Sequence, residues 1–548
     1  MQQNKNLIIA IVLCLGIMFG WGYLAEFMGW VKRPDPVVAT AQQEVAQDQA
    51  RIKAEQEKRE AEAKAKAVVL PVFTPAEGRD VKIDTPLYQA VVYSGGGILR
   101  SYLLTGYGHG LEASSPRINL VNPPTAAVAP WGLLVNGQPS WSTGKWAFEG
   151  DDLKLGVGTQ GTLRFVGEVD GMRIVREFLF RADTYLMTEK IRITPLGDQP
   201  RSVRLGFTVA SDGTAASGGQ YDAMRVAWDL AGKFKEDSDT KDLSTTGVQD
   251  KGQIFWASTM STYFMNAVAP ADTADLTLKG RLQNDIFRAA LERPDLVIPA
   301  GTETEVDVSY WVGPKVRSLL AQAPNNLVNT IDLGMFSIIA KALLWLLQYF
   351  YDYVHNWGVA IILLTVLIKA AFWPLTAKSY ASMEKMKKLQ PMMTSLREKY
   401  ADNKEQMNKE VMSLYKTYGV NPASGCVPIL VQLPVFFGLY QALLTSIELR
   451  HASLITYLPG TDMLWLADLS AKDPYYITPI IMGITMFLQQ RMSPPAGDPM
   501  QQKIMMFLPL IFTAMFLNFP SGLVIYWLVN NVLSIAQQWM MMRKLKAA

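Results

Sequence analysis

Long apolar segments occur in two parts of the chain, near the N-terminus and after residue 331. The first runs from Leu7 to Trp30 and, at 1.5 Å per helical residue, is long enough to cross about 30 Å of hydrocarbon. We therefore predict a transmembrane anchor over residues 1–30. A cleaved signal peptide is the alternative, but the small residues Ala39 to Ala41, which resemble a cleavage site, lie well beyond the apolar core.

The second apolar part begins with a segment that carries Lys341, Gln348 and Asp352. These polar residues predict an interfacial amphipathic helix within a connecting segment at 321–355. Five more transmembrane helices are predicted in a membrane core at 356–542, which makes six spans with the anchor. Their expected ranges are about 357–377, 425–447, 475–491, 504–518 and 522–541. The turn sequence Asn518 to Gly522 separates the last two spans.

Between the two apolar parts lie a charged tether and a predicted β domain. Residues 31–70 are rich in Ala, Gln, Glu and Lys without an apolar stripe, which is typical of a solvated helix or a flexible tether. Residues 71–320 contain short strand-like runs, and Asp170-Gly171 is a hairpin turn sequence between two of them. We predict an all-β sandwich here, so the fold class is a polytopic α-helical membrane protein with a large all-β domain.

The basic residues predict the orientation of these segments. The polar segment at 378–423 has nine basic residues against five acidic ones, whereas 448–474 has two against four. The tail at 543–548 adds three more basic residues. By the positive-inside rule, the 378–423 segment and both termini are cytoplasmic and the β domain lies outside. The 378–423 segment itself predicts a helical hairpin that breaks near Gln390-Pro391 and stops at Gly419.

Composition and charge exclude several classes of protein. Only 18% of the 548 residues are charged, below the roughly 25% of soluble domains. The formal net charge of +3 gives no strong field for nucleic acid, so no DNA partner is expected. Cys14 and Cys426 are far apart, and the three histidines form no spaced cluster, so neither a disulfide framework nor a metal site is predicted.

Short motif matches do not predict an enzyme. The GxGxxG match at 156–161 is followed by a strand-like run, whereas a dinucleotide site needs a helix there. Two SxxK matches, at Ser382 and Ser413, lie in the charged hairpin without the other motifs of a serine hydrolase. No phosphate-binding loop sequence is present, so we expect no cofactor and no ATP-driven step.

Lys369 is the most informative single residue, because it lies inside the apolar run of the second span. A lysine at the centre of a span costs about 2.5–3.5 kcal/mol on insertion scales. Snorkelling to the cytoplasmic headgroups is the alternative, but Lys378, where the polar segment begins, is roughly 13 Å of helix away. We therefore favour a functional cation in a wet interior.

Other polar residues within the predicted spans support a hydrophilic groove. Thr365 lies one turn before Lys369 and shares its face, and Gln432 is in the middle of the third span. The last span carries a polar stripe at Trp527, Asn530 or Asn531, Ser534 and Gln538. Hydrogen bonds between helices are the usual alternative explanation for such residues. The five predicted spans of the membrane core contain no carboxylate to pair with Lys369, so the groove suits negative charge that enters from outside.

Four segments closely resemble the YidC family of membrane protein insertases. They are NWGVAIILLTVLIKAAFWPLTAKSYASMEKM, GCVPILVQLPVFFGLYQALLTSIELR, DPYYITPIIMGITMFLQQRMSP and DPMQQKIMMFLPLIFTAMFLNFPSGLVIYWLVNN. The resemblance is strong over about 356–540 and weaker in the outer domain, where Tyr310 to Pro314 carries it. It implies a Gram-negative-type inner-membrane insertase with a periplasmic β-supersandwich and a hydrophilic groove that opens to lipid and cytoplasm.

The resemblance also implies roles for particular residues. Lys369 matches the cation of the family's groove, which is commonly arginine, and Thr365, Gln432 and Trp527 match groove or substrate-contact positions. Lysine keeps the charge but not the bidentate geometry of arginine. The 378–423 hairpin resembles the family's cytoplasmic substrate-capturing element. Its candidate contact residues are Met383, Met386, Lys387, Lys388, Met392 and Met393.

The partners implied are nascent membrane proteins, the SecYEG translocon with its SecDF accessory complex, and membrane lipids. The ribosome and the signal-recognition-particle receptor are further candidates, although the short basic tail weakens the case for the ribosome. Two other classes of function stay open. A groove open to lipid also suits a lipid scramblase or a solute transporter, but we find neither the internal repeats nor the intramembrane acids of a transporter. A carbohydrate-processing enzyme rests on analogy of the outer fold alone.

Overall fold

The computed structural model describes residues 77–112, 114–216, 222–400, 403–419, 427–492 and 499–547. The predicted anchor at 1–30 and the tether at 31–70 lie outside these residues. The chain divides into two compact units, Met1–Ile331 and Asp332–Ala548, and each is described by itself.

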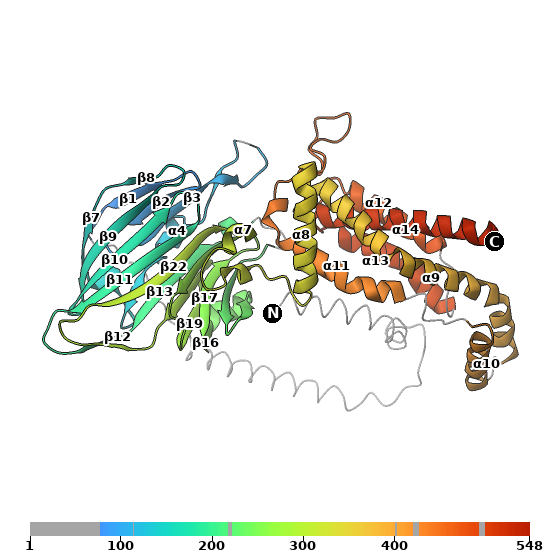
Figure 1. Cartoon of the computed structure of the whole chain (residues 1–548), viewed down its shortest axis with the longest axis horizontal. Coiled ribbons are helices and arrows are strands. Elements are labelled where there is room, and N and C mark those ends of the chain that lie inside the picture. The colour runs from blue at the N-terminus through green and yellow to red at the C-terminus, as the bar shows by residue number, and fades with distance from the viewer. Residues whose placement is uncertain are drawn as a thin grey trace, which may run out of the picture. The chain divides into compact units, whose positions relative to one another are not determined.

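The described part of the first unit is built from β-sheets, and the largest of them has nine strands (Figure 1). Its strand order is β15 (Lys233–Asp237), β14 (Arg225–Leu230), β17 (Ile254–Met260), β18 (Phe264–Pro270), β22 (Thr304–Pro314), β11 (Leu186–Pro195), β10 (Met172–Arg181), β9 (Gln160–Val169) and β7 (Lys145–Glu149). The predicted turn at Asp170-Gly171 is confirmed, because it joins β9 to β10 with φ angles of 49° and 68°. Positive φ at both positions is what a tight two-residue hairpin requires.

Three smaller sheets complete the described β unit. The six-stranded sheet has the order β16 (Val248–Gly252), β19 (Leu276–Gln283), β20 (Ile286–Glu292), β13 (Leu205–Asp212), β5 (Leu133–Val135) and β6 (Gln138–Pro139). The five-stranded sheet has the order β4 (Arg117–Asn119), β3 (Ile98–Gly108), β2 (Tyr88–Tyr93), β1 (Asp80–Asp84) and β8 (Leu153–Lys154), and β12 (Arg201–Val203) pairs with β21 (Leu296–Ile298). Short helices lie at α4 (Pro123–Ala126), α5 (Ser140–Thr143), α6 (Thr240–Thr245) and α7 (Arg317–Leu320). The β class predicted for this part of the chain is therefore correct.

A fully buried ion pair lies in the middle of the nine-stranded sheet. Arg176 of β10 donates from Nε to Glu189 Oε1 of β11 at 2.5 Å, and Tyr310 of β22 donates to the other carboxylate oxygen at 3.1 Å. The remaining guanidinium nitrogens donate to the backbone carbonyls of Gly96 and Trp131. Neither charged side chain has any exposed surface. A charge buried this deeply is tolerated only when it is paired and fully hydrogen-bonded, and this network meets that condition.

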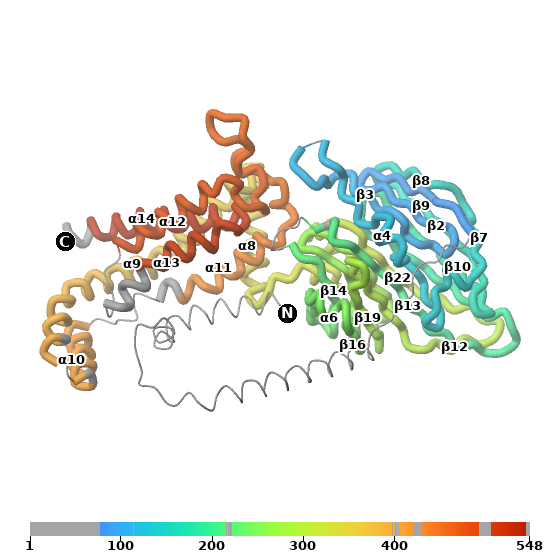
Figure 2. The backbone as a smooth tube through the Cα atoms, turned by 180° about the vertical axis from the view of Figure 1, so that it is seen from behind, coloured from blue at the N-terminus to red at the C-terminus, as the bar shows by residue number. Residues whose placement is uncertain are grey.

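The second unit is helical. Its described helices are α8 (Ser337–Val354), α9 (Trp357–Lys399), α10 (Lys404–Thr417), α11 (Val427–Thr445), α12 (Ile477–Met492), α13 (Pro499–Phe516) and α14 (Ser521–Ala547). In Figures 1 and 2, helices α9, α11, α12, α13 and α14 run along one another, α8 lies across one end of this bundle, and α10 lies near the other. A large β-sheet unit and a helical unit thus confirm the coarse architecture predicted from the sequence.

Length and composition identify one described helix as able to cross a membrane, over Trp357–Leu396. Two shorter apolar helices lie at Leu430–Thr445 and Met506–Phe516. The bounds of α11 to α14 fall close to the ranges expected for spans three to six. The total of six spans stays a prediction.

The predicted break of the cytoplasmic hairpin at Gln390-Pro391 is wrong. Helix α9 continues through both Pro374 and Pro391 and ends at Lys399. A proline removes one backbone hydrogen bond, which bends or breaks a helix unless packing holds it. Met393, just after the proline, is buried and accepts a hydrogen bond from Tyr415 of α10, and this contact holds the segment in place. The predicted stop is confirmed, because α10 ends at Thr417 and Gly419 has a φ of +61°.

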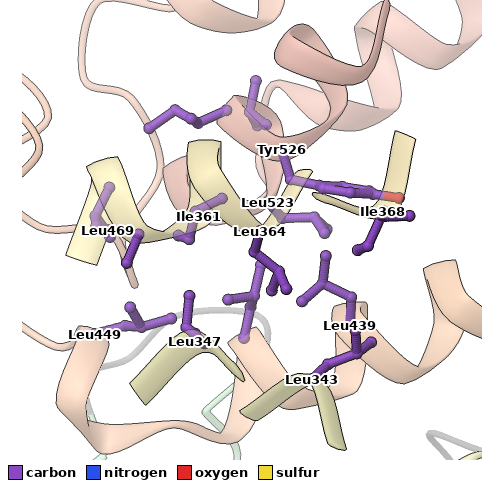
Figure 3. Close-up of a cluster of buried hydrophobic side chains, with 14 of the residues drawn as sticks. Leu343, Leu347, Ile361, Leu364, Ile368, Leu439, Leu449, Leu469, Leu523 and Tyr526 are labelled. Atoms are coloured by element: carbon purple, nitrogen blue, oxygen red, sulfur yellow. The ribbon is translucent and has the colours of Figure 1, made fainter. Parts of the chain in front are cut away.

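The apolar core of the helical unit lies where α8 crosses the bundle (Figure 3). Leu343 and Leu347 of α8 point into it, and they meet Ile361 and Leu364 of α9. Leu439 of α11, Leu523 and Tyr526 of α14, and the loop residues Leu449 and Leu469 complete the cluster. This core fixes α9 against α14, which are the two helices that carry the candidate site.

Candidate functional site

Lys369 and Ser534 connect helices α9 and α14 through a hydrogen bond inside the helical unit. Lys369 Nζ donates to Ser534 Oγ at 2.7 Å, and Ser534 Oγ in turn donates to the carbonyl of Asn530 at 2.7 Å. Lys369 is 8% exposed and Ser534 is 3% exposed. The acceptor of the ammonium group is therefore a neutral hydroxyl, and not a carboxylate that would cancel its charge.

The other predicted groove residues are less closely connected. Thr365 is fully buried, and its hydroxyl donates to the carbonyl of Ile361 in its own helix at 2.7 Å. Asn530 contributes its backbone carbonyl to the lysine–serine contact, while its side chain is half-buried. Gln432 of α11 is also half-buried, and no hydrogen bond joins it to Lys369 or Ser534 among the described residues.

Trp527 belongs to an aromatic cluster. Its ring lies 4.8 Å from that of Phe436 in an edge-on arrangement and 5.2 Å from that of Phe516. Phe512 stacks on it at 6.0 Å. Trp527 thus joins α11, α13 and α14 in an apolar cluster, two turns before Ser534 on the same helix.

Several buried polar residues near the site were not among the predicted contact residues. Asn531 of α14, and not Asn530, turns its amide toward α12, with Thr485 Oγ1 at 3.4 Å. Gln537 Nε2 donates to the carbonyl of Trp373 at 3.5 Å. Gln538 is 3% exposed, and its Oε1 has no hydrogen-bond partner in the part of the chain that the structure describes. The predicted polar stripe of the last span contained Asn531 and Gln538 but not Gln537, and its period alone does not say which helix each residue contacts.

The predicted contact residues of the cytoplasmic hairpin do not form one surface. Lys387, Lys388 and Met392 are exposed, Met383 and Met386 are half-buried, and Met393 is buried against α10. A small cavity of about 10 Å³ connects part of this set with the last helix. Its lining includes Met383 and Lys387 of α9, Met492 of α12, and Gln538, Met541 and Met542 of α14. Gln538 therefore lies between the hairpin and the Lys369–Ser534 contact.

Among the described residues, no group of three or more His, Cys, Asp or Glu side chains could hold a metal ion. What the arrangement offers is a buried cation without a carboxylate, an unpaired buried amide oxygen, and flexible thioethers near the hairpin.

Comparison with known families identifies both units. Residues 349–548 match the family described as 60Kd inner membrane protein, and residues 80–346 match the YidC periplasmic domain. The chain is therefore an inner-membrane protein with a periplasmic β domain and a helical membrane domain.

Full-length relatives give the same result. The chain is 58% identical over 543 residues to the membrane protein insertase YidC of Nitratidesulfovibrio vulgaris strain DSM 19637 / Miyazaki F, covering 99% of this chain and 100% of the relative. It is 53% identical over 552 residues to the same-named protein of Lawsonia intracellularis, with coverages of 99% and 100%. A crystal structure of an active YidC insertase, with its first transmembrane domain resolved, aligns with 86% of this chain and 94% of that one, at 16% identity and a TM-score of 0.34. The chain belongs to the YidC family of membrane protein insertases, and its function is the non-enzymatic insertion of membrane proteins.

Proposed function

We propose that this insertase moves the polar flank of a nascent membrane protein along a path from the cytoplasmic hairpin to Lys369, without ATP hydrolysis. In the proposed topology, six spans place both termini and the 378–423 hairpin in the cytoplasm. The charge asymmetry of the loops supports this orientation. The observation that carries the proposal is the hydrogen bond from Lys369 Nζ to the neutral Ser534 Oγ.

This hydrogen bond describes a resting state that an acidic client can displace. A hydrogen bond to a charged group contributes about 1.5–3 kcal/mol, but a hydroxyl does not neutralise the ammonium charge. A carboxylate from a client would replace the hydroxyl and form a charge-assisted hydrogen bond with the cation. Lys369 therefore separates from Ser534 when an acidic flank arrives and returns to it when the flank leaves.

The path toward Lys369 begins at the hairpin. Lys387 and Met392 are exposed, so in this proposal they contact a client first. Met383 and Gln538 line the same small cavity, which is the next part of the path. Methionine side chains are flexible and polarizable, so they fit apolar segments of many shapes. The unpaired Oε1 of Gln538 offers an acceptor to a backbone N–H or a water molecule on the way.

The apolar part of the client then leaves sideways into lipid. Transfer of apolar surface from water is favourable by about 25 cal/mol per Å², so a hydrophobic segment supplies the driving force for its own insertion. Nascent membrane proteins are the substrates of an insertase. We further propose that the SecYEG translocon and the SecDF complex are partners, which rests on the family resemblance.

Four variants at one position test the electrostatic step. Vesicles carrying the wild type, Lys369→Arg, Lys369→Leu or Lys369→Glu receive matched clients that differ only in the charge of the translocated flank. We expect Lys369→Arg to retain insertion. Lys369→Leu should reduce the insertion of clients with acidic flanks, and Lys369→Glu should reduce it most. Clients with neutral flanks serve as the control and should change little. Equal insertion by all four proteins at every flank charge would remove the electrostatic role and leave Lys369 as a structural residue.

A further inference from the structure

The loop between α11 and α12 contains an ordered β-hairpin at residues 454–466. Trp465 N donates to Thr456 O at 3.0 Å, and Leu458 N donates to Met463 O at 2.8 Å. The turn closes with Thr461 N donating to Leu458 O at 3.0 Å, and Gly460 between them has a φ of +79°. Proline at the second position and glycine with positive φ at the third are the features of a type II turn. The hairpin is therefore a defined element of the helical unit.

One face of this hairpin is apolar and exposed. Tyr457 pairs with Leu464 across the hairpin, and Ile455 lies two residues before Tyr457 on the same arm. Their exposed fractions are 43% for Ile455, 53% for Tyr457 and 39% for Leu464. We call these three residues the hairpin face. Asp462 is the sole charged residue between positions 453 and 467. Two-stranded hairpins are only marginally stable in water, and exposed apolar patches often mark binding surfaces. We therefore expect another molecule to cover the hairpin face.

The base of the hairpin is fixed at the start of helix α9. A Cβ on Gly358, in the first turn of α9, would lie 2.5 Å from Leu454, so the glycine allows the hairpin to approach the helix backbone closely. Asn356 Nδ2 also donates to Leu454 O at 3.2 Å. The apolar stretch of α9 begins at Trp357. The hairpin therefore leaves the bundle at the level where the apolar span begins.

The direction of the hairpin is visible in the two overall views. In Figures 1 and 2 the loop between α11 and α12 leaves the bundle at the end where α8 lies, far from α10, and projects sideways across the direction of α9 and α14. Helices that cross a bilayer run along its normal. A projection across them, at the level of the span's end, runs along the surface of the bilayer.

We propose that the hairpin face binds lipid at the boundary between headgroups and acyl chains, in the leaflet nearest to α8. The level of its base, its sideways direction and its near absence of charge all fit this occupant. Tyrosine is suited to the boundary because its ring is apolar and its hydroxyl is polar. Thr461 and Asp462 in the turn stay in the headgroup region. The hairpin thus holds the bundle at a fixed depth, beside the route by which clients enter lipid.

Site-directed spin labels measure this depth in the full-length protein reconstituted in phospholipid vesicles. Cys14 and Cys426 are first replaced by serine, and a nitroxide is then placed by Tyr457→Cys, Thr461→Cys, Leu510→Cys or Val157→Cys. Leu510 is 68% exposed on α13 and serves as the lipid control, and Val157 is 85% exposed in the β domain and serves as the water control. The measurement is the collision rate with oxygen, which concentrates in lipid, relative to that with a water-soluble nickel chelate.

We expect the oxygen-to-nickel ratio to be several-fold higher at 457 than at 157, approaching that at 510, with 461 in between. A ratio at 457 equal to that at 157 would overturn the proposal, because the face would be in water. Low accessibility to both reagents would also overturn it, because the face would then be covered by protein. The measurement uses no client and needs no insertion activity. Its result therefore does not depend on whether the proposed insertase mechanism is correct.

Discussion

Gly483 of α12 faces Thr513 of α13 at a distance that leaves no room for a side chain. A Cβ on Gly483 would lie 2.1 Å from Thr513 Oγ1. The threonine cannot easily turn away, because its hydroxyl donates to the carbonyl of Pro509 at 2.7 Å. Small residues at such crossings let helix backbones approach in membrane proteins, and here one glycine sets the spacing of two helices.

Gly483→Ala should therefore destabilise the helical unit by about 1–3 kcal/mol, the usual cost of overpacking. Thermal unfolding of the purified protein in detergent measures the effect. Thr513→Ala in the same chain removes the clashing hydroxyl and should restore most of the stability. If Gly483→Ala alone unfolds like the wild type, the close crossing is not present.

Ser534→Ala should destabilise the protein by about 1.5–3 kcal/mol, because the ammonium group of Lys369 loses its acceptor while it stays buried. In a Lys369→Met background the same change should be nearly neutral, since no cation then needs a partner. The difference between the two backgrounds is the coupling energy of the pair, obtained from denaturation in detergent. A coupling of zero would mean that the two side chains do not interact.

Glu189→Gln should destabilise the β domain by about 3–5 kcal/mol, because it leaves the guanidinium of Arg176 buried without its counter-charge. The pair of Arg164 and Glu149 supplies a matched control, since both side chains are largely exposed at 42% and 53%. Glu149→Gln should have little effect. Differential scanning calorimetry of the full-length protein can compare the two variants, and similar melting temperatures would contradict the buried network.

His451, in the loop between α11 and α12, should make the helical unit less stable at low pH. Burial, and then the nearby charge of Arg450, lower the pKa of His451 below its ordinary value of 6.5, and Asp468 offsets this only in part. The unfolded chain therefore binds the proton more readily, so stability falls as the pH drops below about 6.5 and levels off below the folded pKa. His451→Asn should remove this part of the pH dependence while it tolerates the positive φ of 60°. Melting temperatures of both proteins between pH 5 and 8 provide the check, and parallel curves would refute it.

Pro391→Ala should stabilise the cytoplasmic hairpin, because α9 is already helical through this position and alanine restores a backbone hydrogen bond. Slower cleavage by a protease between Leu396 and Lys409 would show the effect. Pro434→Ala in α11, also inside a helix, controls for a general effect of removing proline. Faster cleavage would indicate that the proline is needed for the packing of α9 on α10.

The sequence predicted the elements better than their contacts. Apolar runs indicated where α11 to α14 lie, with ends one to six residues from those expected, because length and hydropathy are local properties. The contact between Lys369 and Ser534 joins residues 165 positions apart, and no local pattern specifies which faces of α9 and α14 meet. The polar stripe left Asn530 and Asn531 as alternatives for the same reason, since neighbours on a helix point about 100° apart.

The buried network of the β domain was missed although a signal was present. Arg176 is in phase with Ile174 and Phe178, which point to the same side of β10 and are buried. A charged residue in phase with the apolar side of a strand indicates a buried charge, and its partner Glu189 lies on the adjacent strand. The sequence alone could not identify Glu189 as the partner of Arg176, because this requires the register of β10 against β11.

Helix α9 continues without interruption from the apolar stretch that begins at Trp357 into the predicted cytoplasmic hairpin, so the two parts belong to one long helix. Pro374 lies five residues after Lys369 and lacks the N–H that the carbonyl of Ala370 would otherwise accept, so bending is easiest there. The arm from Pro374 to Lys399 extends roughly 38 Å beyond this fulcrum. We expect a client that binds this arm to bend α9 at Pro374, close to the turn that holds Lys369 against Ser534, so that binding at the hairpin weakens the contact between these two residues.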